Sequence, residues 1–283
     1  MKTHRIIGGG GTQLHLIETG NSQGRPIVFI HGFSQCWRAW SRQLSSELAG
    51  DYRLIAMDLR GHGLSDKPRD AYGDSRLWAD DVRAVIEALN LDRPVLCGWS
   101  YGPLVILDHL RHYGEDRIAG IHFVGGITKL GSNAAMSVIT PEFLSLVPGF
   151  STTDAEESVR SLESSLRLCF AQQPSASDLY MMLGYNVSVP PHVRQALLSR
   201  VIDNDDLLPR IRKPVLITQG AKDAIVKLAV VDQHKAGLAH AQIHILPDAG
   251  HAPFWEDPAA FNQRLRAFVE MCSAAAMGRP AIA

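Results

Sequence analysis

The chain alternates short, continuous apolar runs with segments of helical periodicity, and this alternation constrains its fold more than any other feature. Four apolar runs lie in the first half of the chain, at residues 26–32, 52–58, 94–99 and 118–126. Strands that read as continuous apolar runs are typically buried on both faces, as in parallel sheets. Between the second and third runs, apolar residues recur on one helical face over residues 78–89. This order predicts an α/β fold with a mostly parallel sheet covered by helices.

The alternation is interrupted in the middle of the chain. Two further strand patterns, PVLITQG at 214–220 and AQIHILP at 241–247, follow the interruption. Residues 128–212 contain several helical patterns and no convincing strand, and a structureless loop of this length is uncommon inside a compact domain. We therefore predict a core domain made of residues 1–127 and 213–283, with a helical cap of residues 128–212 inserted between two of its strands.

Composition and charge argue against several classes of protein. The formal net charge of the 283 residues is −1, so bulk electrostatics points to neither nucleic acid nor an anionic membrane as a partner. No apolar stretch reaches about 18 residues, which argues against a membrane span, and the N-terminal segment lacks the apolar region of a secretory signal. The four cysteines are widely spaced, without a CxxC pair or a disulfide framework. We expect a cytoplasmic protein; a homodimer is possible, although no interface signature identifies one.

A serine between two glycines stands at the junction of an apolar strand and an apolar helix. The sequence Gly98-Trp99-Ser100-Tyr101-Gly102 has the form G-x-S-x-G. Glycine has no Cβ atom, so the two glycines permit a bend that steric clashes would otherwise block. An ordinary Ser/Gly turn would also explain the motif, but a strand-to-helix junction is the context in which a nucleophilic serine is presented above a sheet. Ser100 is therefore the candidate nucleophile.

The candidate base and its orienting carboxylate lie in the last third of the chain. A serine hydroxyl is a weak nucleophile near neutral pH and needs a neighbouring base that a third group orients. Of the 12 histidines, His251 lies in a loop just after the last apolar strand, where loops of an open α/β sheet converge on its ligand crevice. Asp223 follows the end of the preceding strand, from which its carboxylate could reach His251. Three other carboxylates compete with it for this role: Asp206, Asp248 and Asp257.

The first apolar strand pattern ends in a second motif that fits acyl transfer. Attack by a serine on an acyl carbon generates an oxyanion, which needs hydrogen-bond donors that are already in place. The strand runs out into His31-Gly32-Phe33, and Gly32 allows bare backbone to approach the nucleophile. We predict that the backbone N–H groups of Phe33 and Tyr101 form the oxyanion hole.

Taken together, several segments resemble the landmarks of the α/β-hydrolase superfamily, and the resemblance covers essentially the whole chain. In chain order they are HGFSQCWRAW, MDLRGHGLSD, GWSYG, GAKD and GHAPFWEDP. The resemblance implies an α/β-hydrolase fold, with an eight-stranded, mostly parallel sheet flanked by helices and a helical cap inserted after the sixth strand. Ser100, Asp223 and His251 also occur in the order of the family's catalytic triad. The same resemblance implies that the loop at residues 58–66 has a structural role.

The resemblance also bears on cofactors and on related enzymes. It implies no metal or organic cofactor, and His109 and His112, three residues apart on one helix, would need further ligands to bind a metal. Haloalkane dehalogenases and epoxide hydrolases of this fold use an aspartate where this chain has Ser100, which disfavours both activities. Pro103 replaces the small residue of many relatives, and proline in the first turn of a helix removes no intrahelical hydrogen bond.

We expect a serine hydrolase that cleaves carboxylic esters, lactones included, through a Ser-His-Asp triad and an acyl-enzyme intermediate. The expected substrates are small to medium apolar esters, because the predicted cap is rich in apolar and methionine side chains. The predicted substrate contacts are Trp99, beside the nucleophile, and four residues of the cap: Met136, Leu144, Met182 and Tyr185.

Two alternatives keep the same catalytic residues. The triad could instead hydrolyse carbon–carbon bonds of ring-cleavage products or catalyse cofactor-free perhydrolysis, as in bacterial haloperoxidases. An acidic ring-cleavage product would require a cationic pocket, for which Arg160, Arg167 and Arg194 are candidates. The second alternative is a small-molecule receptor on the same scaffold, which would also keep an intact-looking triad. A fold does not decide between these functions.

Overall fold

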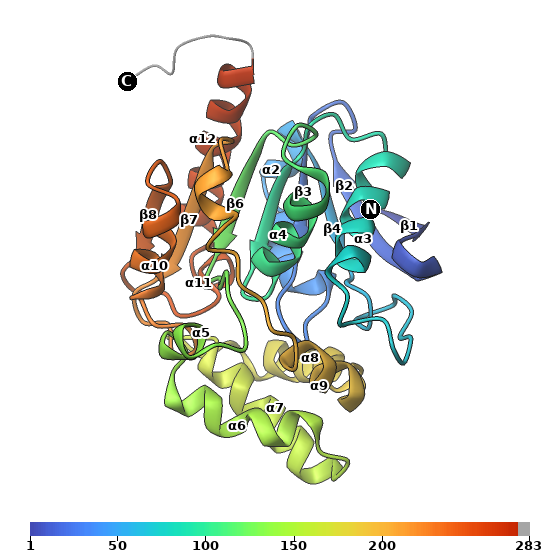
Figure 1. The fold of residues 1–283 in the computed structure, drawn as a ribbon, viewed down its shortest axis with the longest axis vertical. Helices are drawn as coiled ribbons and strands as arrows, with labels where there is room; N and C mark the ends of the chain where they lie inside the picture. The colour runs from blue at the N-terminus through green and yellow to red at the C-terminus, as the bar shows by residue number, and fades with distance from the viewer. Residues whose placement is uncertain (277–283) are drawn as a thin grey trace.

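A computed structural model describes the backbone of residues 1–276 and the side chains of residues 1–273, and it contains the predicted eight-stranded sheet (Figure 1). The strand order across the sheet is β1-β2-β4-β3-β5-β6-β7-β8. The strands are β1 (Lys2–Ile7), β2 (Gln13–Gly20), β3 (Arg25–Ile30), β4 (Tyr52–Met57), β5 (Val95–Trp99), β6 (Gly120–Val124), β7 (Val215–Gly220) and β8 (Gln242–Leu246). β2 pairs with β1 and β4 in antiparallel orientation, and the other neighbouring strands are parallel. The sheet is therefore mostly parallel, as predicted.

Helices cover both faces of the sheet. Neighbouring residues of a strand point to opposite faces, and on β6 His122 packs against Phe261 of α12, whereas Phe123 packs against His234 of α10. Gly98, the register partner of Phe123, contacts α4, so α4 and α10 cover one face and α12 covers the other. The helices outside residues 128–212 are α1 (Ser41–Leu44), α2 (Leu48–Asp51), α3 (Ser75–Ala88), α4 (Gly102–Tyr113), α10 (Val230–Gly237), α11 (Pro253–Glu256) and α12 (Pro258–Ala276), with 3₁₀ turns at Gly9–Gly11 and Trp37–Trp40. A third 3₁₀ turn, Leu208–Arg210, lies just before β7. None of the helices within residues 1–276 combines the length and the apolar character that crossing a membrane requires.

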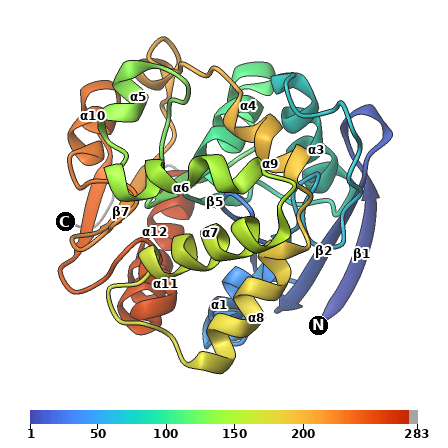
Figure 2. The same ribbon diagram turned by 90° about the horizontal axis from the view of Figure 1, so that it is seen from below.

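A run of helices separates β6 from β7, and we call residues 128–212 the helical segment. Its helices are α5 (Asn133–Ser137), α6 (Pro141–Ser151), α7 (Ala155–Leu168), α8 (Ala176–Val187) and α9 (Pro191–Leu198). The outgoing and returning ends of the segment are joined by an antiparallel bridge, in which Leu130 and Ile202 exchange two N–H···O=C bonds of 2.9 Å. Figures 1 and 2 show α6 to α9 gathered at one end of the sheet. We call the side of the sheet where the parallel strands end its carboxyl edge, and the side where they begin its amino edge. The helical segment follows the carboxyl end of β6, so it lies at the carboxyl edge.

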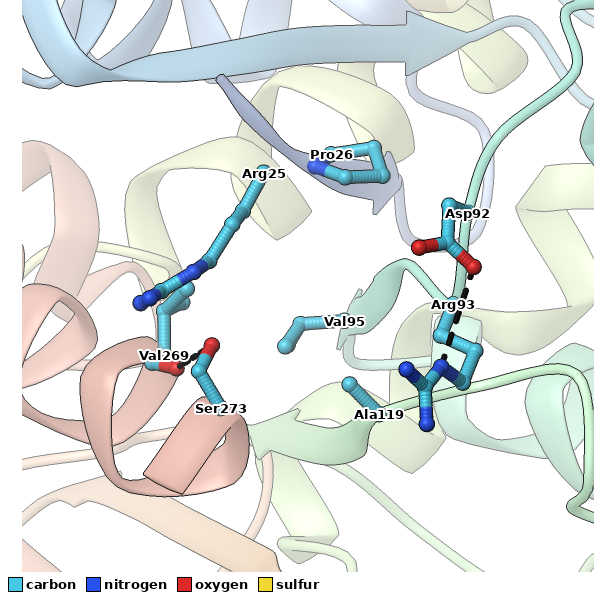
Figure 3. Close-up of a pocket in the computed structure, with 8 residues that line it drawn as sticks. All are labelled: Arg25, Pro26, Asp92, Arg93, Val95, Ala119, Val269 and Ser273. Atoms are coloured by element: carbon cyan, nitrogen blue, oxygen red, sulfur yellow. Dashed lines mark hydrogen bonds and ion pairs between the residues drawn. The ribbon is translucent and has the colours of Figure 1, made fainter. Parts of the chain in front are cut away.

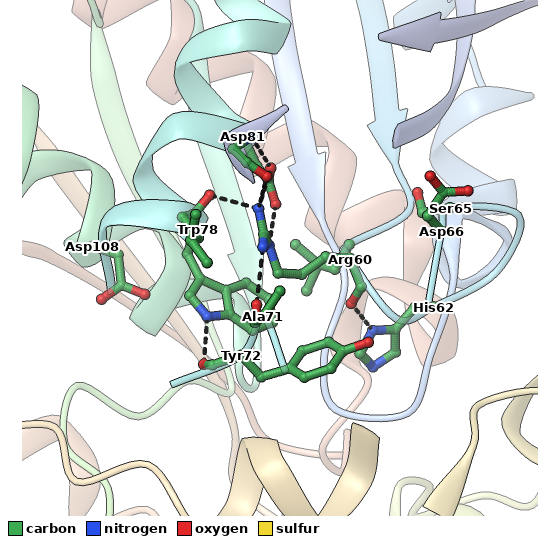
Figure 4. A network of polar contacts seen from close by, with 12 residues as sticks. Arg60, His62, Ser65, Asp66, Ala71, Tyr72, Trp78, Asp81 and Asp108 are labelled. Atoms are coloured by element: carbon green, nitrogen blue, oxygen red, sulfur yellow. Dashed lines mark hydrogen bonds and ion pairs between the residues drawn. The ribbon is translucent and has the colours of Figure 1, made fainter. Parts of the chain in front are cut away.

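Buried charges hold the loop at residues 58–66 (Figure 4). The Arg60 side chain is fully buried and forms an ion pair with Asp81 of α3, with 2.7 Å between Nε and Oδ2. Its other donors reach three backbone carbonyl groups, those of Gly9, Ala71 and Leu77. Asp58, also buried, accepts a hydrogen bond of 2.8 Å from His15. A buried charge is tolerated when it is paired and fully hydrogen-bonded, so these residues have a structural role.

Candidate active site

Ser100 connects β5 to α4 in a backbone conformation that few residues other than glycine adopt. Its φ is 58°, in the left-handed region. A Cβ atom on Gly98 would lie 2.7 Å from the Gly102 carbonyl carbon, and one on Gly102 would lie 2.7 Å from the Ile30 oxygen. Both positions therefore exclude larger residues, and the sharp bend places Ser100 at the carboxyl edge of the sheet.

His251 and Asp223 form a buried pair at the same edge. The His251 Nδ1 atom lies 2.8 Å from the Asp223 Oδ2 atom, and the two side chains are 2% and 0% exposed. A carboxylate accepts hydrogen bonds, so Nδ1 carries the ring proton and Nε2 remains the basic nitrogen. The Trp99 indole N–H donates to the His251 carbonyl oxygen at 2.8 Å and so fixes the backbone of the histidine.

Four hydrogen bonds orient the Asp223 carboxylate. Its Oδ1 atom accepts from the backbone N–H groups of Ile225 and Val226, both at 2.8 Å. Its Oδ2 atom accepts from the Gln219 side-chain amide at 2.8 Å as well as from His251. Sequence reasoning missed Gln219, whose signal is a large polar side chain near the end of the mostly apolar strand β7. These contacts fix the direction in which the carboxylate holds the histidine ring.

The competing carboxylates have other partners. Asp248 forms an exposed ion pair with Lys222. Asp206 forms one with Arg111. Asp257 caps α12, because its side chain accepts from a backbone N–H in the first turn of that helix. Of the four candidates, Asp223 is therefore the one that binds the histidine.

Ser100 and His251 line one cavity, which we call the polar cavity. Its other lining residues are Gly32, Phe33, Ser34, Gln35, Trp99, Phe143, Leu162, Ser165, Cys169, Asn186 and Ile225. Within residues 1–273, no hydrogen bond joins the Ser100 hydroxyl to the His251 ring. Catalytic hydrogen bonds are often long or poorly aligned before a substrate binds, and they tighten in its complex. The shared cavity is thus compatible with proton transfer between the two side chains.

The two predicted oxyanion donors lie beside Ser100 in the chain or in space. A Cβ atom on Gly32 would lie 3.4 Å from the Ser100 Oγ atom, so the backbone next to Phe33 comes close to the hydroxyl. In the part of the chain that the structure describes, neither the Phe33 N–H nor the Tyr101 N–H donates to a protein acceptor. Two unengaged N–H groups beside the nucleophile are what an oxyanion hole requires.

The His31 side chain orients one of these donors, a role that sequence reasoning did not identify. The Leu59 N–H donates to His31 Nε2 at 3.0 Å, so the ring proton is on Nδ1, which donates to the Gly32 carbonyl at 2.8 Å. Burial lowers the pKa of His31, which keeps the ring neutral. The C=O and N–H groups of a trans peptide point in opposite directions. The bond to Gly32 therefore also fixes the direction of the Phe33 N–H.

A second cavity, which we call the apolar cavity, also reaches Ser100. Its volume is about 130 Å³. Apart from Ser100 it is lined by Phe33, Tyr101, Ile127, Leu130, Gly131, Met136, Ile139, Phe143, Leu144, Val147, Leu198, Ile225 and Val226. Of the predicted substrate contacts, Met136 and Leu144 line this cavity and Trp99 lines the polar cavity. Met182 and Tyr185 line a smaller neighbouring cavity that shares Trp99 with the polar one.

The Tyr101 phenol ties the helical segment to α4. Arg200, buried just after α9 in that segment, donates to the Tyr101 oxygen at 3.1 Å and to both carboxylate oxygens of Asp108 at 2.9 and 2.8 Å. The Tyr101 hydroxyl itself donates to the Leu197 carbonyl at 3.4 Å. Burial raises the pKa of Asp108 to about 6 in spite of the Arg200 charge. The bend that carries Ser100 is thus braced by a buried ion pair.

The arginines considered for a cationic pocket do not face the cavities. Arg160 pairs with Glu156 and Arg167 pairs with Glu163, in both cases on the exposed surface of α7. Arg194 is buried and donates to backbone carbonyl groups within the helical segment. Among the described residues, no lysine or arginine lines either cavity beside Ser100.

A further cavity lies at the opposite, amino edge of the sheet, and we call it the amino-edge cavity (Figure 3). Its volume is about 200 Å³. It is lined by Arg25, Pro26, Asp92, Arg93, Val95, Ala119, Val269 and Ser273. Arg93 and Asp92 are 3.7 Å apart and largely solvated. A solvated pair of this kind supplies neither a nucleophile nor a base held in place.

The sheet order, the bend at Ser100 and the buried His251–Asp223 pair together define a hydrolase of the α/β class. The alpha/beta hydrolase family matches residues 27–264 of this chain. The chain belongs to that family.

Two solved structures are similar to this one over nearly their whole length. The esterase RhEst1 from Rhodococcus sp. ECU1013 is 36% identical, with 95% of this chain and 99% of that chain covered and a TM-score of 0.90. A protein from Burkholderia cenocepacia, proposed to be an aryl esterase, is 35% identical, with 96% and 100% covered and a TM-score of 0.91. Among curated relatives, the AB hydrolase superfamily protein YisY of Bacillus subtilis (strain 168) is 28% identical, over 87% of this chain and 91% of that protein. Others, at 25–27% identity, include a methyl ester esterase, a non-heme chloroperoxidase and a 2-hydroxy-6-oxo-2,4-heptadienoate hydrolase.

Proposed function

We propose that this hydrolase cleaves carboxylic esters, lactones included, of small to medium apolar substrates. One observation carries the proposal: Ser100 lies at a strained bend, in one cavity with a histidine whose ring is oriented by a buried carboxylate. The esterase name of RhEst1, which is 36% identical, supports the same reaction.

The chemistry follows from the positions of the groups. His251 Nε2 takes the proton of the Ser100 hydroxyl as its oxygen attacks the ester carbon, and Asp223 stabilises the imidazolium that forms. The N–H groups of Phe33 and Tyr101 bind the oxyanion. His251 then protonates the leaving alcohol, which departs from the acyl-enzyme. In the second half-reaction His251 activates a water molecule, which releases the acid and restores Ser100.

The two cavities beside Ser100 hold different halves of the ester in this proposal. His251 must reach the leaving oxygen, and it lines the polar cavity but not the apolar one. The leaving oxygen therefore faces the polar cavity, where Gln35 and Asn186 offer hydrogen bonds. This cavity, at about 30 Å³, is too small for a whole p-nitrophenol, so the rest of such an alcohol extends beyond it. The acyl group occupies the apolar cavity, which Ser100 and Tyr101 both line.

The size of the apolar cavity limits the acyl group. An apolar cavity of about 150 Å³ in another protein binds benzene, and the volume here is about 130 Å³. A short, branched or compact aromatic acyl group fits this space. The helical segment contributes Met136 and Leu144 to its wall, so we propose that residues 128–212 act as a cap that selects the acyl group.

The alternative reactions make different demands on the same site. Acidic ring-cleavage products require a positive charge, and the described residues place no lysine or arginine in either cavity, which disfavours carbon–carbon bond hydrolysis. Perhydrolysis replaces water by peroxide in the second half-reaction, and the chloroperoxidase relative keeps it as an alternative. A receptor would bind an ester without turning it over.

The test is steady-state hydrolysis of p-nitrophenyl esters from acetate to decanoate by the wild type and by Ser100→Ala. Brisk turnover that the substitution abolishes, with an optimum at short acyl chains, supports the proposal. A parallel assay with hydrogen peroxide reports peracid formation. Negligible ester turnover by the intact protein contradicts the proposal and favours a receptor, for which ligand-induced shifts in melting temperature are the next measurement.

A further inference from the structure

One carboxylate links the loop of His251 to the helical segment, and the chemistry described above does not use it. Glu256, the last residue of α11, accepts a hydrogen bond of 2.6 Å from the Gly250 N–H through Oε1. Its Oε2 atom accepts from the backbone N–H groups of Ala171 and Gln172, at 2.7 and 3.1 Å. Glu256 thus connects the residue before the histidine with the chain that follows α7.

The same two stretches of chain also touch directly. The Ala252 N–H donates to the Cys169 carbonyl oxygen at 3.1 Å. A Cβ atom on Gly250 would lie 2.7 Å from the Ala171 nitrogen and 3.1 Å from the Cys169 oxygen, so the gap admits only a glycine. Gly250, before His251, is therefore linked to the helical segment through Glu256, and Ala252, after it, is hydrogen-bonded to that segment directly.

The three hydrogen bonds that Glu256 accepts are charge-assisted when its carboxylate is ionised. Hydrogen bonds from N–H groups to a charged carboxylate are about twice as strong as neutral ones. Burial raises the pKa of Glu256, whereas the Gln172, Gly250 and Ala171 N–H groups oppose this shift. Loss of the carboxylate would leave these three backbone N–H groups without their acceptor.

We propose that Glu256 is a positioning residue for His251 and that it makes the position of the histidine depend on the helical segment. This inference rests on the proposed role of His251 as the base of the reaction. Glu256 touches neither the substrate cavities nor the reacting atoms, and it acts through the backbone at Gly250. A displacement of about 1 Å at a catalytic group can lower a rate about 100-fold, so a loosened loop has a large effect.

The experiment compares Glu256→Ala, Glu256→Gln and a control, Asp248→Asn, which removes an exposed carboxylate from the same loop. We expect Glu256→Ala to lower kcat for p-nitrophenyl butyrate about 10- to 100-fold, with KM changed less than threefold. Glu256→Gln keeps one acceptor oxygen and should stay within tenfold of the wild type. Asp248→Asn should stay within twofold.

Two further readouts separate positioning from a general loss of structure and from failure of the proposed function. Labelling of Ser100 by a fluorophosphonate probe should slow in Glu256→Ala in proportion to kcat. Amide hydrogen exchange at residues 249–252 should accelerate in this variant whether or not the wild type hydrolyses esters. A kcat per folded molecule within twofold of the wild type, or unchanged exchange at these residues, would overturn the inference.

Discussion

The two edges of the sheet carry cavities of different character. The amino-edge cavity is larger than either cavity beside Ser100, at about 200 Å³ against about 130 and 30 Å³ for the apolar and polar cavities. Its Arg93 and Asp92 side chains, however, are 48% and 91% exposed and 3.7 Å apart. At the carboxyl edge, His251 and Asp223 are at most 2% exposed and 2.8 Å apart. Catalysis depends on polar groups held in place away from water, so preorganisation and not cavity volume distinguishes the edge that we propose as active.

The largest expected difference between the two edges is in the effect on kcat of a carboxylate-to-amide substitution. Asp223→Asn should lower kcat for p-nitrophenyl butyrate about 10³- to 10⁴-fold, because an amide donor toward Nδ1 would favour the ring tautomer that has no free base at Nε2. Asp92→Asn at the amino edge should leave kcat within twofold. The comparison fails if Asp223→Asn keeps more than a tenth of the wild-type kcat.

The buried ion pair beside Tyr101 and the exposed pair at the amino edge should differ in their contribution to stability. Asp108→Asn leaves Arg200 buried beside a neutral partner and should lower the free energy of unfolding by about 3–5 kcal/mol. Asp92→Asn breaks an exposed pair, for which about 0–1 kcal/mol is expected. Urea unfolding of both variants measures the difference, and equal losses would show that burial is not the cause.

Enlarging a cavity should alter specificity only at the carboxyl edge. Leu144→Ala extends the apolar cavity and should raise the ratio of kcat/KM for octanoate over butyrate about tenfold, since each methylene in an apolar pocket is worth about 1–3 kcal/mol. Val269→Ala, the matched change in the amino-edge cavity, should leave this ratio within twofold. Leu162→Ala in the polar cavity should change the preference for the alcohol instead. A changed alcohol preference in Leu144→Ala would reverse the assignment of the two cavities.

The smallest effect concerns backbone strain at the amino edge. Arg93 has φ of 42°, which costs a residue other than glycine about 1–2 kcal/mol, whereas glycine gives up about 0.5–1 kcal/mol of unfolded-state entropy. Arg93→Gly should therefore raise the free energy of unfolding by about 0.5–1 kcal/mol and leave kcat unchanged. Arg25→Gly, in strand β3, should lower it. A loss of activity in Arg93→Gly would assign a function to the amino edge.

Sequence reasoning predicted the sheet because its signals are local. Continuous apolar runs marked buried strands, and the glycines around Ser100 marked the bend, since each depends only on neighbouring residues. The chain order predicted that Asp223 would orient His251, and the structure pairs these two side chains at the carboxyl edge. The pairing was predictable because both residues follow neighbouring parallel strands, whose ends lie together.

Contacts between distant segments were not predictable in the same way. Helical periodicity shows which side of a helix is apolar, but not what that side faces. Met136 and Leu144 therefore line the cavity at Ser100, whereas Met182 and Tyr185, of the same character, line a neighbouring cavity. Glu256 gave no sign of its partners, since two of its three donors are backbone groups about 85 residues away.

The left-handed backbone of Ser100 has a consequence for how variants of this protein are selected. Glycine adopts a φ of 58° without steric cost, so Ser100→Gly removes the strain together with the proposed nucleophile. A library of variants selected for thermal stability alone should accumulate this change, and the selected proteins should be more stable but without esterase activity. Stabilising changes often lower function where a strained site is needed for it.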